Sequence, residues 1–327
     1  MIQKLRIFQS NTVNPYTNLA IEKYLLDSVD PAECILYLWQ NQNTVVIGRN
    51  QNAWVECRTS LLEEEGGCLA RRLSGGGAVF HDLGNLNFTF LVHPDNYDVD
   101  RQLSVIQAAC AMAGITAEKS GRNDLLTAGS KFSGNAFYKA KQSAYHHGTI
   151  LINANMDKLQ RYLSPSKAKL AAKGVASVRS RVINLQELNP ALTCDIMKDY
   201  MAQAFAEVYG MQPQEVHLDE QSISEIQETA KLYGSWDYLY GTPLPFSFSC
   251  EERFDWGQIR LELQAINGTI IGVKAYSDSM DWQISARVEQ ALTGCTFRLK
   301  DMVAALRNAL PAETAEDLCQ LLQQQNL

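Results

Sequence analysis

Short apolar runs separated by polar turns predict several buried strands in this chain. Cys34–Trp39 and Thr44–Ile47 are apolar or β-branched runs of strand length. Asn85–Val92 alternates instead, with Leu, Phe and Val on one face and Asn and Thr on the other, which predicts a half-buried strand. His147–Asn153 is a further predicted strand. The first part of the chain is therefore expected to contain a β-sheet.

Apolar residues that recur every three or four positions predict helices between these strands. One helix is expected to end at Ser28, with Thr17 or Asn18 capping its first turn. Two more are expected over Leu103–Ala113 and Ile196–Val208, and Gly210 can end the last of them. The mixture of strands and helices indicates an α+β fold.

The end of the chain predicts a hairpin followed by two helices. Asn267-Gly268 lies between two alternating segments and is a strong signal for a two-residue hairpin turn. Amphipathic helices are expected over Lys300–Leu310 and Ala312–Gln324. Strands followed by helices in so short a segment indicate a separate small α+β domain. We therefore predict two domains, over residues 1-246 and 251-327.

Composition narrows the class of protein. The chain has 327 residues, 46% of them hydrophobic, and a formal net charge of -7. A net-acidic chain is not a general binder of nucleic acid. Its eight cysteines form no C-x-x-C pair, and we expect them to be reduced, buried thiols. The N-terminus resembles no signal peptide and no run of 18 apolar residues occurs, so we expect a cytoplasmic protein with no membrane segment.

The segment RRLSGGGAVFHDLGN at 71–85 is the most informative part of the chain. Three consecutive glycines are costly in conformational entropy, and they allow backbone N–H groups to approach anionic oxygens. The two arginines can make bidentate contacts with phosphate or carboxylate. A flexible connector would also explain the glycines, and the spacing matches neither the Walker nor the dinucleotide motif. The segment is therefore a candidate phosphate loop of another kind.

A second group of polar residues lies farther along the chain. Lys131 precedes a Ser-Gly turn and can neutralise a phosphate or carboxylate. Asp124 is a candidate Mg²⁺ ligand, although other acidic residues such as Asp82 lie near the glycine motif. His146 and His147 are adjacent, but neighbours on a strand face opposite ways, and a zinc site is not expected.

A local basic segment stands out in this acidic chain. Residues 158–186 contain no Asp or Glu, and their basic residues are Lys158, Arg161, Lys167, Lys169, Lys173, Arg179 and Arg181. A solvated basic face is one explanation. The other is a loop over Ser164–Arg181 that closes over a phosphorylated intermediate.

Taken together, these motifs resemble the bacterial lipoate–protein ligases, which share a superfamily with the biotin–protein ligases. The matching stretches include RRLSGGGAVFHDLGN at 71–85, SGRNDL at 120–125, KFSGNA at 131–136, HHGTILIN at 146–153, KLAAKGVASVRSRVINL at 169–185 and SWDYLYGTPLPF at 235–246. The resemblance covers essentially the whole chain. It implies mixed β-sheets flanked by helices, as in the biotin/lipoate ligase catalytic domain, plus the small C-terminal α+β domain.

The resemblance also implies a site. Contacts to ATP or lipoyl-AMP are expected from Arg72, Gly75, Gly76, Gly77, Ala78, Val79, Phe80, Lys131, Lys173 and Ser177. Contacts to lipoate are expected from Trp39, Arg72, His81, Lys131, His147 and Thr149. Lys131 is the expected catalytic residue, and Asp124 the expected Mg²⁺ ligand. Trp39, Val46 and Phe88 are expected to line an apolar slot for the lipoyl chain.

The implied function is activation of lipoate by ATP to lipoyl-AMP, followed by transfer of the lipoyl group to a lysine of an acceptor. The acceptors implied are apo lipoyl domains of 2-oxoacid dehydrogenase complexes and the glycine-cleavage carrier protein. An ATP-independent lipoyl or octanoyl transferase is the main alternative. The intact Arg122-Asn123-Asp124 motif and the absence of cysteine from residues 146–193 favour the ligase. A lipoate-binding protein without catalysis and a nucleic-acid-binding module are further alternatives.

Overall fold

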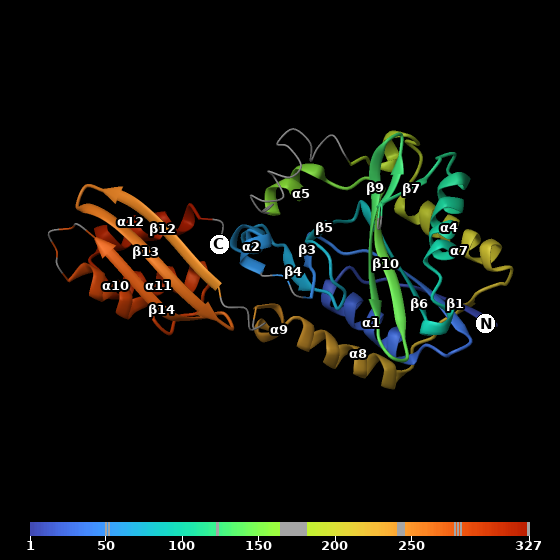
Figure 1. The fold of residues 1–327 in the computed structure, drawn as a ribbon, viewed down its shortest axis with the longest axis horizontal. Helices are drawn as coiled ribbons and strands as arrows, with labels where there is room; N and C mark the ends of the chain where they lie inside the picture. Colours follow the sequence, from blue (N-terminus) through green and yellow to red (C-terminus); the bar gives the residue numbers. More distant parts are fainter. Residues whose placement is uncertain are drawn as a thin grey trace. The chain divides into compact units, whose positions relative to one another are not determined.

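The computed structural model describes residues 1–49, 51, 53–121, 124–163, 182–240, 246–277, 279, 281 and 283–325. The chain divides into two compact units (Figure 1). The first unit is built from Met1–Gln51 and Gly66–Gly234, and the second from Asn52–Glu65 and Ser235–Leu327. The segment Asn52–Glu65 thus belongs to the same unit as the C-terminal part of the chain. No sequence pattern indicated this.

The first unit contains, among its described residues, an eight-stranded sheet in the order β11-β1-β2-β6-β10-β9-β8-β7. Its strands are β1 (Lys4–Gln9), β2 (Glu33–Trp39), β6 (Asn85–Val92), β7 (Glu118–Ser120), β8 (Asp124–Thr127), β9 (Ser130–Lys139), β10 (Ala144–Leu151) and β11 (Gln214–Glu215). A smaller sheet has the order β4-β3-β5, with β3 (Thr44–Ile47) between β4 (Cys68–Arg71) and β5 (Val79–His81). The mixed sheets flanked by helices confirm the predicted fold class.

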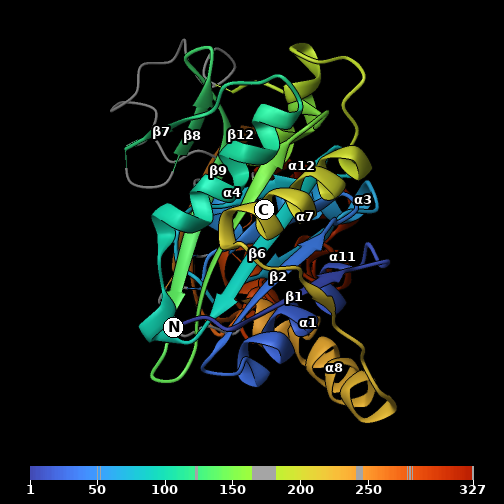
Figure 2. The same cartoon turned by 90° about the vertical axis from the view of Figure 1, so that its right-hand side faces the viewer.

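Helices of the first unit pack against the large sheet. The helices of this unit are α1 (Pro15–Ser28), α4 (Val99–Met112), α5 (Met156–Tyr162), α7 (Cys194–Tyr209) and α8 (Glu220–Tyr233), with short 3-10 turns at Pro94–Asn96 and Leu185–Glu187. Figures 1 and 2 show α4 and α7 side by side over one face of the sheet. Apolar residues of α4 and α7 form a core there with alternate residues of the strands, such as Leu36, Phe88 and Phe90.

Two sequence expectations need correction here. β6 was expected to be half-buried, but all eight of its residues are buried because its polar face also lies inside the protein. The first helix begins at Pro15, and its cap is Asn14, whose side chain accepts from the backbone N–H groups of Tyr16 and Thr17. Asn18, one of the expected caps, is instead fully buried within the first turn.

The second unit contains the predicted hairpin and helices. β13 (Gly257–Ile266) pairs with β12 (Phe246–Phe254) and with β14 (Thr269–Ser277). Asn267 and Gly268 form the turn between β13 and β14, and both have positive φ, as a two-residue hairpin turn of this kind requires. The helices are α2 (Ala53–Glu56), α3 (Thr59–Glu64), α9 (Trp236–Tyr240), α10 (Ile284–Leu292), α11 (Leu299–Ala309) and α12 (Ala312–Gln323). The expected helix pair divided by Pro311 is therefore confirmed.

The cysteines and the helices bear on the class of protein. All eight cysteines are free thiols. Burial raises the pKa of Cys34, Cys57 and Cys110 to about 12, so these thiols stay protonated and are poor nucleophiles. None of the described helices has both the length and the apolar character needed to cross a bilayer.

Candidate active site

A cavity in the first unit is lined by many of the predicted site residues. Its volume is about 380 Å³. The residues that line it are Leu19, Trp39, Val46, Arg72, Gly76, Gly77, Ala78, Val79, His81, Asn87, Lys131, Gly134, Asn135, Ala136, His147, Gly148 and Thr149. They come from α1, from both sheets and from the loop between β4 and β5, which are distant in sequence. This cavity is the candidate active site.

The floor of the cavity is a polar face of the large sheet. Strand pairing places Thr149 of β10 opposite Asn87 of β6, and Asn87 opposite Trp39 of β2. Gly134 of β9 continues this row, because its backbone N–H donates to Thr149 Oγ1 at 3.4 Å. His147 belongs to the neighbouring row on the same face. Alternation along each strand therefore produces a cross-strand row from Gly134 to Trp39 that faces the cavity.

The glycine-rich loop is held in shape by Arg72. The guanidinium of Arg72 donates from Nη2 to the carbonyl oxygens of Gly75 and Gly77 at 2.7 and 2.8 Å, and from Nη1 to that of Val46 at 3.0 Å. Burial lowers the pKa of Arg72 to about 10, which still leaves the side chain charged at neutral pH. Arg72 thus places a positive charge beneath the loop while its N–H groups bind the backbone.

The loop also needs glycine for close packing. Gly76 has a φ of 94°, and a Cβ at this position would lie 2.9 Å from Arg72 Nη2. A Cβ at Gly48, the residue after β3, would lie 2.4 Å from the carbonyl oxygen of Gly76. Both contacts are too short for any side chain, so the loop rests directly on the end of β3.

A buried chain of polar groups connects the loop to α1. Ser74 Oγ accepts from Arg72 Nε at 3.0 Å and lies 2.8 Å from His147 Nε2. His147 Nδ1 lies 2.8 Å from Glu22 Oε1, and Thr89 Oγ1 donates to the same oxygen at 2.7 Å. Glu22 is 2% exposed. A buried carboxylate of this kind requires such partners, and they fix the ring of His147 at the cavity wall.

Lys131 enters the cavity from a tight hairpin. Ala128 and Gly129, both with positive φ, form the turn between β8 and β9. The backbone of Lys131 is further held by a hydrogen bond from the N–H of Ile183 at 2.9 Å. Its Nζ lies 2.6 Å from Asp124 Oδ1, and both side chains are about one third exposed. The ammonium group is therefore at the open side of the cavity, within reach of solvent and ligand.

The two adjacent histidines serve different parts of the structure. His146 lies on the core face, with Nε2 2.8 Å from Asn135 Oδ1 and Nδ1 3.1 Å from Gln102 Oε1. His147 lies on the cavity face. Among the described residues, no group of three His, Cys, Asp or Glu side chains converges as a protein-only metal cage would require.

The structure does not bring every predicted residue to the cavity wall. Gly75 and Phe80 do not line it, and Phe80 packs against Tyr162 instead. Phe88 was expected in the lipoyl slot but lies in the core on the opposite face, because strand alternation turns it away from Asn87. Lys173 and Ser177 lie outside the described residues, as do Arg122 and Asn123 of the Arg-Asn-Asp motif.

Sequence reasoning missed several lining residues. Leu19, Asn87 and Asn135 carry no motif that would single them out. One signal was present: the polar stripe of Asn85, Asn87 and Thr89 on an otherwise apolar strand. It was interpreted as a solvent face, and the burial of the whole strand shows that it faces the cavity instead.

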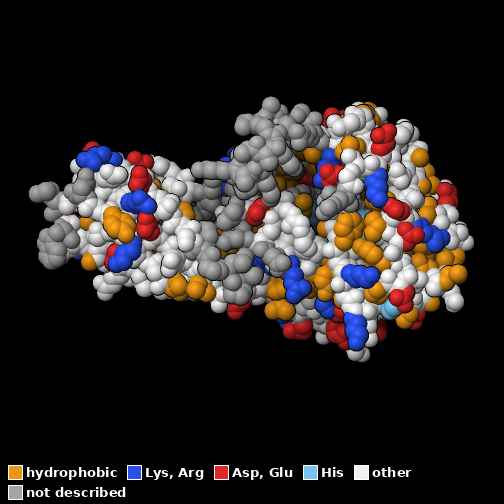
Figure 3. All heavy atoms as spheres, in the orientation of Figure 1, with side chains coloured by type: hydrophobic (Ala, Val, Ile, Leu, Met, Phe, Trp, Pro, Cys, Tyr) orange, Lys and Arg blue, Asp and Glu red, His pale blue; other side chains and the backbone are white. Residues whose placement is uncertain are grey.

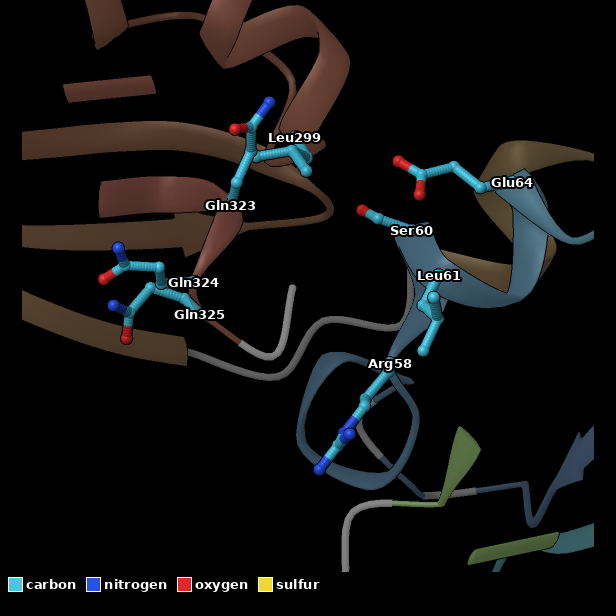
Figure 4. Close-up of a pocket in the computed structure, with 8 residues that line it drawn as sticks. All are labelled: Arg58, Ser60, Leu61, Glu64, Leu299, Gln323, Gln324 and Gln325. Atoms are coloured by element: carbon cyan, nitrogen blue, oxygen red, sulfur yellow. The ribbon is translucent and has the colours of Figure 1, made fainter. Parts of the chain in front are cut away.

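The second unit contains a polar hollow of about 390 Å³ (Figure 4). Arg58, Ser60, Leu61 and Glu64 lie on one side of it, and Leu299 and Gln323–Gln325 on the other. The lining combines amide and charged groups with few apolar side chains. It offers no slot for an apolar chain, so it is a weaker candidate for the site than the cavity of the first unit.

The predicted basic segment is described only at its two ends. Lys158 and Arg161 lie on α5, and residues 164–181 lie outside the described part of the chain. On the face shown in Figure 3, Lys and Arg side chains (blue) are interspersed with Asp and Glu side chains (red) over the described surface.

Comparison with known proteins gives a consistent result. The family model of the lipoyl protein ligase A/B catalytic domain matches residues 14–206, and that of the bacterial lipoate protein ligase C-terminus matches residues 244–322. Lipoate-protein ligase A of Psychrobacter cryohalolentis is 41% identical over 309 residues, which are 92% of this chain and 91% of that protein.

Two solved structures are similar as well. P. falciparum LipL1 in complex with lipoate has a TM-score of 0.63 at 29% identity, covering 98% of this chain and 100% of that one. The bi-partite lipoate protein ligase of Thermoplasma acidophilum, studied with its E2 lipoyl domain, has a TM-score of 0.65 at 25% identity, covering 74% of this chain and 97% of that one.

Proposed function

The chain belongs to the lipoyl protein ligase A/B family, and from this premise we propose that it is an ATP-dependent lipoate–protein ligase. The observation that carries the proposal is the composition of the cavity in the first unit. One ammonium group, Lys131, and a glycine-rich loop lie at the wall of a cavity that also includes Leu19, Val46 and Trp39. Such a cavity suits a ligand with an anionic head and a largely apolar tail.

The first half-reaction is the activation of the carboxylate. A carboxylate oxygen of lipoate attacks the α-phosphorus of ATP, the bond from that phosphorus to the bridging oxygen breaks, and pyrophosphate leaves. Two anions must meet, so the site has to supply positive charge in advance. Lys131 provides it at the open side, the charge of Arg72 lies beneath the loop, and Gly76 and Gly77 of the loop line the cavity.

The second half-reaction transfers the acyl group. The neutral amine of an acceptor lysine attacks the acyl carbonyl of lipoyl-AMP, an amide bond forms, and AMP leaves as the nitrogen loses its proton. Negative charge develops on the carbonyl oxygen in the transition state. Lys131 Nζ is the cationic donor at the cavity wall that can stabilise this charge. The same residue therefore acts in both steps under this proposal.

The residues present fit a Mg²⁺ that arrives with ATP. Mg²⁺ in nucleotide sites is held by one or two carboxylates together with phosphate oxygens and water. Asp124 does not line the cavity, but its carboxylate lies 2.6 Å from the Lys131 ammonium group, which does, and is about one third exposed. We propose Asp124 as the protein ligand. The ion would neutralise phosphate charge there, and Lys131 would then be released from Asp124 toward the substrate carboxylate.

We propose apo lipoyl domains, including those of 2-oxoacid dehydrogenase complexes and the glycine-cleavage carrier protein, as the acceptors. The E2 lipoyl domain studied with the Thermoplasma ligase supports the first of these. If the basic segment at 158–181 docks an acidic acceptor, the apparent KM for the acceptor rises as salt increases, because screening weakens charge attraction. An unchanged KM between low and high salt would exclude this docking mode.

One experiment tests the proposal as a whole. The full chain is incubated with ATP, Mg²⁺, lipoate and an apo lipoyl domain, and the acceptor mass and pyrophosphate release are measured. A lipoyl mass increment that requires ATP, with stoichiometric pyrophosphate, is the expected result. Transfer from a preformed lipoyl or octanoyl donor without ATP would instead identify a transferase. No cysteine is among the described residues that line the cavity, which supports the ligase.

A further inference from the structure

The backbone that follows β3 is held by the side chain of Arg71. Arg71 is 4% exposed, and its Nη1 donates to the carbonyl oxygens of Gly48, Arg49 and Gln51 at 3.3, 3.0 and 2.7 Å. The N–H of Gly48 donates in turn to Gln51 Oε1 at 2.8 Å. One buried guanidinium that binds three carbonyls fixes the backbone around it. The positions of Gly48 and Arg49 are therefore set by Arg71.

Gly48 and Arg49 lie directly against the glycine-rich loop. A Cβ at Gly48 would be 2.4 Å from the carbonyl oxygen of Gly76, and the N–H of Arg49 donates to the carbonyl oxygen of Ser74 at 2.9 Å. The backbone of Arg49 is thus hydrogen-bonded to the start of the loop. An extended arginine side chain carries its guanidinium about 6 Å from the Cα atom, so Arg49 can reach an anion beside the loop.

The guanidinium of Arg49 is exposed and has no partner. Within the described part of the chain, its side chain makes no hydrogen bond and no ion pair. Arg71 and Arg72 differ from it, because each donates to three backbone carbonyls. The two arginines that the sequence offered as phosphate ligands are therefore bound to backbone, whereas Arg49 is available to a ligand.

The charges of the cavity favour a further cation next to the loop. Arg72 and Lys131 are the only Arg or Lys residues among the described residues that line it. In the proposed reaction, Lys131 pairs with the carboxylate of the acid, and the charge of Arg72 lies beneath the loop. The triphosphate of ATP brings several more negative charges, and those of the β- and γ-phosphates leave together as pyrophosphate. Neither lining cation is assigned to this part of the nucleotide.

We propose that Arg49 binds the β- and γ-phosphates of ATP, and therefore the departing pyrophosphate, from the backbone that Arg71 holds against the glycine-rich loop. This inference rests on the proposed function. Arg49 does not line the cavity assigned to the acid, so its side chain meets the part of the nucleotide that extends past the loop. A guanidinium suits this part because it can bind two phosphate oxygens at once.

The test compares ATP with AMP, which share the α-phosphate and differ in the β- and γ-phosphates. Dissociation constants of both nucleotides and of pyrophosphate are measured by calorimetry with Mg²⁺, on the natural full chain and on Arg49→Gln. We expect Arg49→Gln to bind ATP and pyrophosphate about tenfold more weakly, the loss typical of one charge-assisted contact. Its affinity for AMP should stay within about twofold of the natural value, because AMP lacks the phosphates in question.

Two further variants define the interaction. Arg49→Lys keeps the charge without the planar pair of donors, so we expect an intermediate loss of about threefold for ATP. Arg260→Gln, at an exposed position of the second unit, is the matched control and should leave all three dissociation constants unchanged. Circular dichroism confirms folding, and if Arg49→Gln does not fold, Arg49→Lys alone decides.

The two half-reactions give a second readout. Transfer of the acyl group from preformed lipoyl-AMP to an apo lipoyl domain involves no β- or γ-phosphate. Arg49→Gln should therefore slow pyrophosphate release from subsaturating ATP about tenfold, while single-turnover transfer from lipoyl-AMP keeps its natural rate. A general distortion of the loop would slow both.

Equal binding of ATP by Arg49→Gln and the natural protein would overturn the inference, and so would a loss of AMP affinity as large as the loss for ATP. The proposed function is tested separately by pyrophosphate release from ATP and lipoate. If the natural protein releases none but the dissociation constants behave as expected, the ligase proposal fails while the phosphate site stands. If pyrophosphate is released and Arg49→Gln binds ATP normally, only the assignment of Arg49 fails.

Discussion

Lys131 Nζ lies 2.6 Å from Asp124 Oδ1, across the two strands of the β8–β9 hairpin. The pair is one third exposed, so solvent screening leaves it little net stabilising energy. Its value is positional, because it holds a long, flexible ammonium side chain at the mouth of the cavity. Under the proposed function, an arriving carboxylate takes over this ammonium group without breaking any part of the core.

Removal of the Lys131 ammonium group should abolish most of the activity and leave the fold intact. We expect Lys131→Ala to slow adenylate formation at least about 100-fold, the loss typical of one preorganised electrostatic donor. Pyrophosphate release under single-turnover conditions is the measurement. Lys139→Ala, an exposed lysine on the same strand, is the control and should keep full activity. Near-normal turnover in Lys131→Ala would remove Lys131 from its proposed role.

A single methyl group at Gly134 should disturb Lys131 indirectly. A Cβ there would lie 3.1 Å from Lys131 Nζ and 3.2 Å from Cε, so the ammonium group has to move. We expect Gly134→Ala to lower kcat about tenfold. The end of a lysine side chain yields easily, so Tm should change little. Gly272→Ala is the control, because its nearest neighbour atom is 3.6 Å from the added Cβ. Turnover equal in the two variants would contradict the prediction.

Arg72 should not be replaceable by lysine. Its guanidinium binds three backbone carbonyls at once, which a single ammonium group cannot reproduce. We expect Arg72→Lys to lower the free energy of unfolding by about 3 kcal/mol, since buried carbonyls lose their donors. Urea denaturation measures this, with Arg260→Lys at an exposed position as the control. An unaltered urea midpoint would show that the loop does not depend on the guanidinium.

The buried histidines make the fold sensitive to acid. Burial lowers the pKa of His146 to about 3, from an ordinary value of 6.5. Between these values the unfolded chain binds a proton that the folded chain does not, so the free energy of unfolding falls as pH decreases. The contribution is about 1.4 kcal/mol per pH unit in this window. Urea denaturation at pH 7 and pH 5 should show a smaller loss for His146→Gln than for the natural protein. An equal loss would mean that His146 does not titrate in this way.

The fold could be predicted where local patterns are strong. Asn267-Gly268 and Pro311 fixed the hairpin and the helix boundary in the second unit, because turn chemistry is a local property. The segment around α2 and α3 could not be assigned to that unit, because its membership depends on contacts with residues far along the chain. The alternation of β6 was identified, but alternation does not say whether the polar face meets solvent or a buried cavity.

The site was predictable where residues carry distinctive chemistry. Lys131, Arg72 and the triple glycine stand out in the sequence, and the structure brings Lys131, Arg72, Gly76 and Gly77 to the wall of one cavity. The function of Arg72 within the loop was not evident, because a guanidinium that binds backbone carbonyls and one that binds phosphate look alike in sequence. Asn87 has no distinctive neighbours in sequence. Its place in the row is set by register with β2 and β10, a non-local property.

The row from Gly134 to Trp39 has a consequence for how this enzyme can change. Each strand in the row carries cavity residues on one face and core residues on the other, so insertion or deletion of one residue within β6 would exchange Asn87 for Phe88 or Leu86. Such an event would destroy the candidate active-site cavity and the hydrophobic core at once. New substrates can therefore be acquired at this row only by substitution, one side chain at a time, while changes of length are confined to the loops beyond the strands.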